Sequence, residues 1–90
     1  MGAQAKKVQI PHGTFRHYSS GAQVEQQHEE RSVAAVVSGC LRLKVDNQSM
    51  VLRASDAATI PARARYQLEA IDDSLVYHYA EPGEETLWGV

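Results

Sequence analysis

Hydrophobic and polar residues alternate along most of this chain, in short runs that turn residues separate. The clearest run covers residues 41–45, where Leu41, Leu43 and Val45 take every second position and Arg42 and Lys44 lie between them. A period of two residues is typical of a β-strand with one buried face. Gly, Ser, Asp and Asn, which favour turns, occupy the gaps between runs. The pattern therefore predicts a series of antiparallel strands.

The segment at residues 22–30 is the one place where a helix competes with this prediction. Its Gln and Glu content favours a helix, but Val24 is almost its only apolar residue, so no helical face exists. We therefore expect an extended segment with Val24, Gln26 and His28 on one side. The other predicted strands cover residues 8–10, 14–18, 32–38, 41–45, 50–53, 58–60, 66–70 and 75–80, with turns at 46–49, 54–56 and 72–74.

The run at residues 32–38 is apolar on both faces. Val33, Ala35 and Val37 alternate with Ala34 and Val36. A strand that is apolar on both sides in so small a protein implies that its outer face meets another layer or another subunit. With 90 residues the core is thin, and Cys40, the only cysteine, excludes an internal disulfide. We therefore expect a homodimer that uses the outer face of Val33, Ala35 and Val37 together with the strand edges.

Charge and composition exclude several classes of partner. The formal net charge is -2, and the lysines and arginines are scattered, so no nucleic-acid surface is expected. No apolar run reaches the length of a membrane span, and the amino terminus lacks the apolar block of a signal peptide. These features and the single cysteine predict a cytoplasmic protein without membrane partners.

The chain divides into one domain with two short ends. Residues 1–7 are polar and are expected to be disordered, whereas strands from residue 8 to residue 82 form the domain. Residues 83–90 contain Leu87 and Trp88, which are too apolar for a solvated tail, so we expect the tail to pack on the domain or on a partner subunit.

Over residues 8–82 the order of landmarks resembles the cupins. These landmarks are a polar strand with His28, an apolar strand that ends at Gly39, and the segment Ser55-Asp56 before Ala57-Ala58-Thr59-Ile60-Pro61-Ala62. The resemblance implies an all-β fold, a small cupin-type antiparallel β-barrel of the double-stranded β-helix or jelly-roll kind.

The metal-ligand positions of the family are mostly replaced. Cupins usually show Gly-Asp and then Ile-Pro-Ala-Gly-x-x-His, whereas Ser55 and Arg63 stand for the two glycines here and Tyr66 stands for the histidine. In the first motif, Gln26 and His28 match the two histidines and Ser32 matches the carboxylate or amide ligand. A divalent transition metal needs three or four strong donors, so we expect no conventional metal and no other cofactor. Metal binding through His28, His78 and a further donor remains an alternative.

Two subgroups of short cupins resemble parts of the chain. Cupins that open or isomerise uronate sugars carry a cavity carboxylate on the last strand, where this chain has His78 before Glu81-Pro82. The cupin-like nucleoside phosphorylases are the second subgroup. They resemble this chain at Ser38-Gly39 and the leucines that follow, and at Tyr66-Gln67-Leu68. Neither resemblance assigns a substrate.

Strand parity places five polar side chains inside the predicted barrel near one mouth: Gln26, His28, Ser32, Tyr66 and His78. Each buried polar group costs about 1–3 kcal/mol when it is unpaired, so the cluster must pair internally, hold water or meet a ligand. Arg63 and Arg65 are expected at the same mouth, where they would attract an anionic ligand or serve as surface charge.

Three uses of this pocket follow. It is a water-filled remnant of a metal site, or it uses His28 and His78 as acid and base with Tyr66 in the chemistry of an isomerase or lyase, or it binds a polar, sugar-like small molecule without turnover. We favour small-molecule binding, with Gln26, Ser32, Arg63 and Arg65 as ligand-binding residues.

Overall fold

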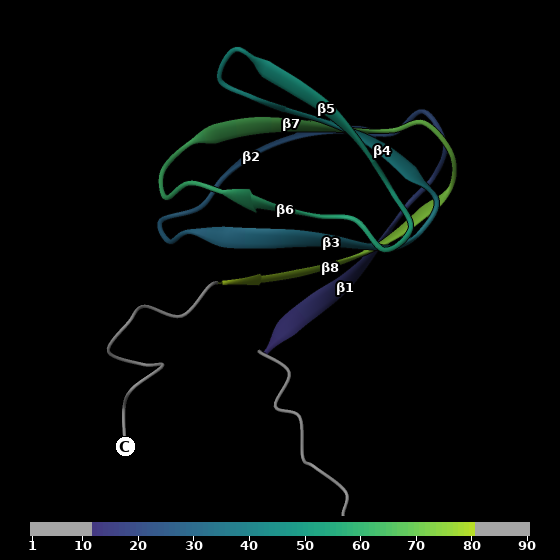
Figure 1. Cartoon of the computed structure of the whole chain (residues 1–90), viewed down its shortest axis with the longest axis horizontal. Coiled ribbons are helices and arrows are strands. Elements are labelled where there is room, and N and C mark those ends of the chain that lie inside the picture. Colours follow the sequence, from purple (N-terminus) through teal and green to yellow (C-terminus); the bar gives the residue numbers. More distant parts are fainter. Residues whose placement is uncertain (1–11, 81–90) are drawn as a thin grey trace, which may run out of the picture.

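The computed structural model describes residues 12–80, which form β-strands joined by short turns (Figure 1). The strands are β1 (Gly13–Tyr18), β2 (Gln23–Gln27), β3 (Ser32–Ser38), β4 (Cys40–Val45), β5 (Gln48–Arg53), β6 (Ala57–Ile60), β7 (Arg65–Ala70) and β8 (Ser74–Ala80). The extended prediction is confirmed over residues 23–27 by β2, whereas residues 28–30 lie in the turn that follows. The expected strand at residues 8–10, the N-terminus at 1–7 and the tail at 83–90 lie outside the described residues. Within residues 12–80, no helix has the length and apolar character that crossing a bilayer requires.

The strands form two four-stranded antiparallel sheets. The first sheet has the order β1-β8-β3-β6, and the second sheet has the order β2-β7-β4-β5. Among the described strands only the β4–β5 hairpin joins neighbours of one sheet, and the other connections cross between the sheets, so the two layers face each other (Figure 1). Crossing of this kind is typical of a jelly roll. The predicted all-β jelly-roll class is therefore confirmed.

The hydrophobic core lies between the two sheets. Alternation puts Leu41, Leu43 and Val45 of β4 inside, and Leu41 and Leu43 are fully buried. Leu52 of the edge strand β5 is buried as predicted, whereas Met50 on the same face remains 36% exposed near the β4–β5 turn. That turn is shorter than predicted, because β5 begins at Gln48 directly after Asp46 and Asn47. Burial of one large aliphatic side chain contributes about 1.5–3 kcal/mol, so this layer is the main source of stability.

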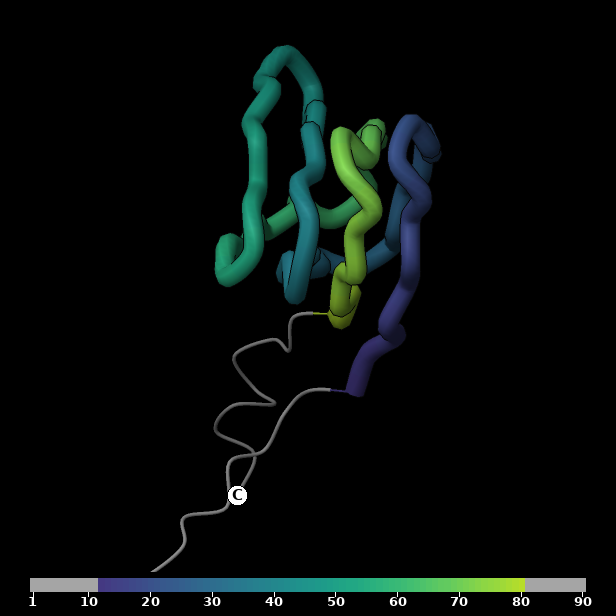
Figure 2. Tube along the Cα trace, turned by 90° about the vertical axis from the view of Figure 1, so that its right-hand side faces the viewer, coloured from purple at the N-terminus to yellow at the C-terminus, as the bar shows by residue number. Residues whose placement is uncertain are grey.

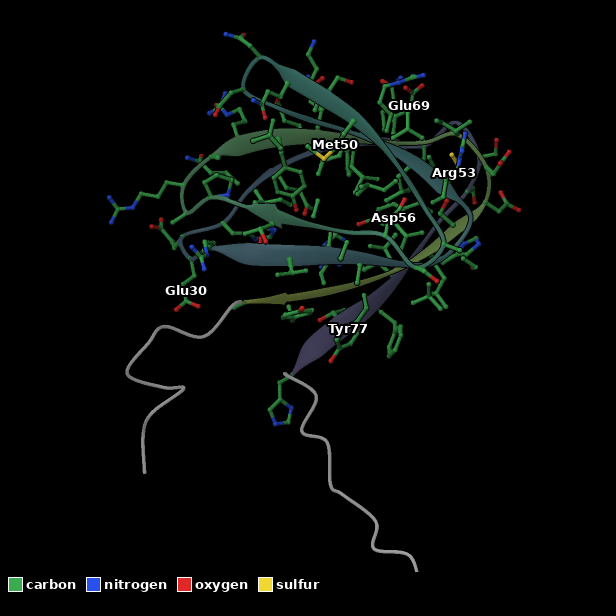
Figure 3. All side chains as sticks on the ribbon, viewed as in Figure 1. Glu30, Met50, Arg53, Asp56, Glu69 and Tyr77 are labelled. Atoms are coloured by element: carbon green, nitrogen blue, oxygen red, sulfur yellow. The ribbon has the colours of Figure 1, made fainter. Side chains whose placement is uncertain are left out.

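The outer faces of the two sheets differ in charge. The outer face of the second sheet carries charged residues such as Arg42, Lys44 and Glu69. The described outer face of the first sheet carries no Lys, Arg, Asp or Glu; its residues are Gly13, Phe15, His17, Val33, Ala35, Val37, Ala57, Thr59, Leu75, Tyr77 and Tyr79. Figure 3 shows Tyr77 on the side of β8 that faces away from the second sheet. Phe15 is 64% exposed and Val37 is 49% exposed. The homodimer through this face stays a prediction.

Both residues that replace the glycines of the cupin motif have the backbone conformation of a glycine. Ser55 has φ 80° and Arg63 has φ 64°, in the left-handed region. A residue with a Cβ atom costs about 1–2 kcal/mol more there than in the right-handed region. Both turns therefore have a glycine-like backbone although neither residue is a glycine.

Replacing Ser55 by glycine is expected to raise the free energy of unfolding by about 0.5–1 kcal/mol, since the relief of strain exceeds the entropy that glycine adds to the unfolded chain. Urea unfolding measures the change. Ser49→Gly is the matched control, because Ser49 lies within β5 at a φ below zero and its loss should destabilise. Equal effects of the two changes would show that Ser55 is not strained.

Candidate functional site

A cavity of about 360 Å³ opens at one end of the domain, between the first sheet and β2. Figure 2 shows that the start of β1 and the end of β8 lie together at one end, and the register confirms it by pairing Gly13 with Tyr79. The cavity is lined by Thr14, Arg16, Gln26, His28, Glu29, Glu30, Ser32, His78, Tyr79 and Ala80. Glu30 is labelled in Figure 3 at this end. The volume lies in the range of about 300–1,000 Å³ that small-molecule sites occupy.

Strand register explains why these side chains meet. His78 of β8 lies between Thr14 of β1 and Ala34 of β3, so all three point to the inner face of the first sheet. In the second sheet Gln26 is paired directly with Tyr66 of β7. Paired residues on one face have Cβ atoms about 4.5–5.5 Å apart, which is within reach of a hydrogen bond between their side chains.

The first polar group at the cavity is a chain of three side chains from the second sheet and the turn after β2. The Tyr66 hydroxyl donates to Oε1 of Gln26 at 2.9 Å, and Nε2 of His28 lies 2.8 Å from the same hydroxyl oxygen. A tyrosine hydroxyl has a single proton. Because that proton is used on Gln26, the hydroxyl oxygen accepts from His28, which fixes the proton of His28 on Nε2.

The second polar group pairs two strands of the first sheet. The Tyr18 hydroxyl lies 3.0 Å from Nε2 of His78, and the two rings meet edge to face. Tyr18 is buried, with 7% of its surface exposed. Each histidine of the cavity is therefore held through Nε2 by a tyrosine, one from each sheet.

Burial and the charge of Arg16 shift the pKa values of these groups. Burial raises the pKa of Tyr66 to about 12, with Tyr18 adding to the rise and Arg16 opposing it. Burial also raises the pKa of Tyr18, and the charge of Arg16 lowers it in part. The pKa of His78 is lowered to about 4, first by burial, then by Arg16 and then by His28. At pH 7 both tyrosines are protonated and His78 is neutral.

Several polar atoms of the cavity wall have no partner within the domain. Among residues 12–80, the Ser32 hydroxyl, Nδ1 of His28, Nδ1 of His78 and the amide nitrogen of Gln26 take part in no hydrogen bond. In the same residues no fully buried side-chain nitrogen or oxygen is unpartnered. These atoms must therefore touch solvent, and the cavity that their residues line is where they reach it.

The structure brings together most of the residues that strand parity selected. Gln26, His28, Ser32 and His78 line the cavity, and Tyr66 lies behind His28 and Gln26. Ser32 is 8% exposed, because it starts β3 on the inner face.

The two arginines expected at the mouth do not line the cavity, although the Arg63 backbone nitrogen donates to the carbonyl of His28 at 2.7 Å. Arg63 and Arg65 are not part of the cavity wall. Arg65 precedes the buried Tyr66 in β7, so alternation turns it to the outer face beside Lys44 and Gln67. Arg63 is exposed and lies 3.6 Å from Glu29. The ligand-binding role expected of both arginines stays a prediction.

Sequence reasoning missed Tyr18 and Arg16. Both lie on the inner face of β1 with Thr14, since Tyr18 is buried and its alternate neighbours share its face. The alternation of residues 14–18 could have indicated them. However, the apolar residues Phe15 and Tyr18 fall on opposite faces of that strand, so the alternation alone did not identify the inner face.

The described residues do not form a transition-metal site. No group of three or more His, Cys, Asp or Glu side chains gathers in residues 12–80 at a spacing that would hold a metal ion. The two histidines use Nε2 on tyrosine hydroxyls, and the remaining donors of the wall are a hydroxyl and an amide. A divalent transition metal requires stronger donors than these.

A larger groove of about 440 Å³ follows the outer face of the second sheet. Its wall is made of alternate polar residues of β2, β4 and β7, and Arg42 and Glu69 there form an ion pair of 2.8 Å. Gln23 also donates to Glu69 at 3.4 Å. Because these side chains satisfy one another on an open surface, the smaller cavity is the better candidate site.

No family model and no curated protein matches this chain. Solved structures do match. The fold is similar to an RmlC-like cupin from Shewanella frigidimarina, with a TM-score of 0.71 and 21% identity over 83% of this chain and 68% of that one. It is also similar to a cupin superfamily protein from Desulfitobacterium hafniense, with a TM-score of 0.68 and 14% identity over 76% of this chain and 64% of that one.

A eukaryotic structure has the same fold. The Cnp3 cupin domain from Schizosaccharomyces pombe gives a TM-score of 0.66 and 13% identity over 84% of this chain and 60% of that one. The chain thus spans between 60% and 68% of these three solved structures. At this level of identity the likeness concerns the fold, which agrees with the two facing antiparallel sheets. This chain is a small domain with the cupin fold.

Proposed function

We propose that the domain binds a small hydroxyl-rich molecule, such as a sugar or a sugar derivative, in the cavity between β1 and β2. The observation that carries the proposal is the set of unpartnered polar atoms that open into one space of about 360 Å³ from both sheets. Three of them belong to Gln26, His28 and Ser32.

The chemistry of these atoms matches hydroxyl groups. A hydroxyl both donates and accepts hydrogen bonds. The amide nitrogen of Gln26 donates, Nδ1 of His28 accepts when the ring proton is on Nε2, and the Ser32 hydroxyl does both. The atoms are held in place because Tyr66 fixes His28 and Gln26 through its own hydrogen bonds. Preorganised groups of this kind lose little entropy when a ligand binds.

Binding has more support than acid and base catalysis by the two histidines. With a pKa of about 4, His78 is a neutral imidazole and not an imidazolium at neutral pH, so it cannot act as a general acid there. The same low pKa makes it a weak base. Its Nε2 is also engaged by Tyr18. His78 therefore suits a hydrogen-bonding role better than proton transfer.

A thermal-shift screen over sugars, sugar acids, polyols and nucleosides tests the proposal, since a ligand of the folded state raises the melting temperature. We expect at least one compound to bind, and we expect Ser32→Leu, which fills the cavity wall, to weaken binding by about tenfold or more. Ser49→Leu on the outer face of the second sheet is the matched control and should bind normally. Circular dichroism checks that both variants fold. Equal binding by folded Ser32→Leu would place the ligand elsewhere.

A further inference from the structure

Arg16 is the basic side chain of the cavity wall within the described residues. It lies on β1 between Thr14 and Tyr18, on the inner face and near the opening. Across the opening the wall carries Glu29 and Glu30 from the turn after β2. The cavity wall thus has Arg16 on one side and two carboxylates on the other, one of which, Glu29, lies 3.6 Å from Arg63.

The guanidinium of Arg16 has no partner in the described part of the chain. It forms neither an ion pair nor a hydrogen bond, although two carboxylates share the same cavity wall. Two other arginines of the described residues are paired, since Arg42 lies 2.8 Å from Glu69 and Arg63 lies 3.6 Å from Glu29. All five N–H donors of Arg16 are therefore open to a ligand.

We infer that Arg16 binds a carboxylate of the ligand, so that the cavity takes a small hydroxy acid. This inference rests on the proposed function and adds the ligand's charge to it. A guanidinium donates two parallel hydrogen bonds to a carboxylate, which fixes orientation as well as charge. The unpartnered groups of Gln26, His28 and Ser32 then meet the hydroxyls at the other end of the same molecule.

Arg16 is close enough to these groups for one small molecule to reach both. Its charge lowers the pKa of Tyr18, Tyr66 and His78, which belong to three different strands around the cavity. The register agrees, because Thr14 pairs with His78 and Arg16 is the next residue of β1 on the same face. All of the groups that would contact the ligand line the same wall.

A carboxylate fits the charges of the wall better than a phosphate does. A phosphate monoester carries about two negative charges at neutral pH. One arginine would face that charge while Glu29 and Glu30 would repel it across the opening. A singly charged carboxylate is balanced by Arg16 alone.

The test compares matched acids and neutral analogues by titration calorimetry at pH 7: glucuronate against glucose, and gluconate against glucitol. We expect at least one acid to bind about tenfold or more tightly than its neutral analogue. In Arg16→Gln that preference should disappear, so that the acid and its neutral analogue bind with similar affinity. Arg53→Gln removes the same charge from the outer face of the second sheet and should keep the preference. Figure 3 shows Arg53 and Glu30 at opposite ends of the molecule.

The outcomes separate this inference from the proposed function. If the neutral analogues bind as well as the acids, or if Arg16→Gln keeps the preference, the role of Arg16 is wrong and the hydroxyl-binding cavity survives. If the thermal-shift screen finds no ligand and none of these acids and analogues binds, both fail. Glucose 6-phosphate binding more tightly than glucuronate would overturn the assignment of a carboxylate.

Discussion

Replacing Gly39 by alanine is expected to lower the free energy of unfolding by about 3 kcal/mol or more. Gly39 joins β3 to β4 with φ 97°, a conformation that residues with a Cβ atom rarely adopt. A Cβ atom there would also lie 2.6 Å from Cα of Ser74 and would overlap the Asp73 carbonyl and the Ser74 hydroxyl. The Ser74 hydroxyl cannot move away without losing hydrogen bonds, since it accepts one from the Cys40 nitrogen at 3.0 Å and donates one to the Asp72 carbonyl at 2.7 Å.

Gly21→Ala measures the cost of backbone strain without the steric overlap that is present at Gly39. Gly21 has φ 88°, but an added Cβ atom would meet nothing within 4 Å. We expect this change to cost about 1–2 kcal/mol, from the backbone conformation alone. Urea unfolding of both variants measures the two effects. A loss at Gly39 no larger than the loss at Gly21 would contradict the close packing of the β3–β4 turn against β8.

The stability of the domain should depend on pH through His78. The folded pKa of about 4 lies below the ordinary value of 6.5, so between these values the unfolded chain binds a proton that the folded chain does not. The stabilising contribution is complete above pH 6.5 and is lost as the pH falls towards 4. We expect a loss of about 2 kcal/mol between pH 7.5 and pH 4.5, after allowance for the partial exposure of the ring.

His78→Gln separates the pH dependence that His78 causes from that of the carboxylates, because the carboxylates titrate in both proteins. Glutamine keeps a hydrogen-bonding group beside Tyr18 but takes up no proton in this range. The difference in unfolding free energy between wild type and His78→Gln should therefore shift by about 2 kcal/mol, in the direction of a less stable wild type, as the pH falls from 7.5 to 4.5. A difference that stays constant with pH would show that His78 is not held neutral by its surroundings.

Strand parity predicted the fold and most of the candidate site because both depend on local alternation. The alternation of Leu41, Leu43 and Val45 identifies the inner face of β4 without knowledge of its neighbours. Gln26 and His28 were placed inside by the position of Val24, although β2 carries few apolar residues. The cupin landmarks then gave the order in which such strands are joined.

Non-local pairing explains what the sequence did not reveal. Tyr18 meets His78 across the first sheet, sixty positions along the chain, and no local pattern shows that contact. Arg65 was expected at the mouth for its nearness to Tyr66, but adjacent residues of a strand point to opposite faces. The φ values of Ser55 and Arg63 are likewise invisible in their side chains and were indicated only by the glycines that the family carries there.

Mapping of a bound ligand tests the central claim most directly, namely that side chains from both sheets converge on one binding cavity. The most stabilising compound of the thermal screen should be titrated into isotope-labelled protein and followed by two-dimensional NMR. We predict that the largest shift changes fall on Arg16, Gln26, His28, Ser32 and His78. Changes that gather instead around Arg42 and Glu69, in the groove of the second sheet's outer face, would contradict the claim.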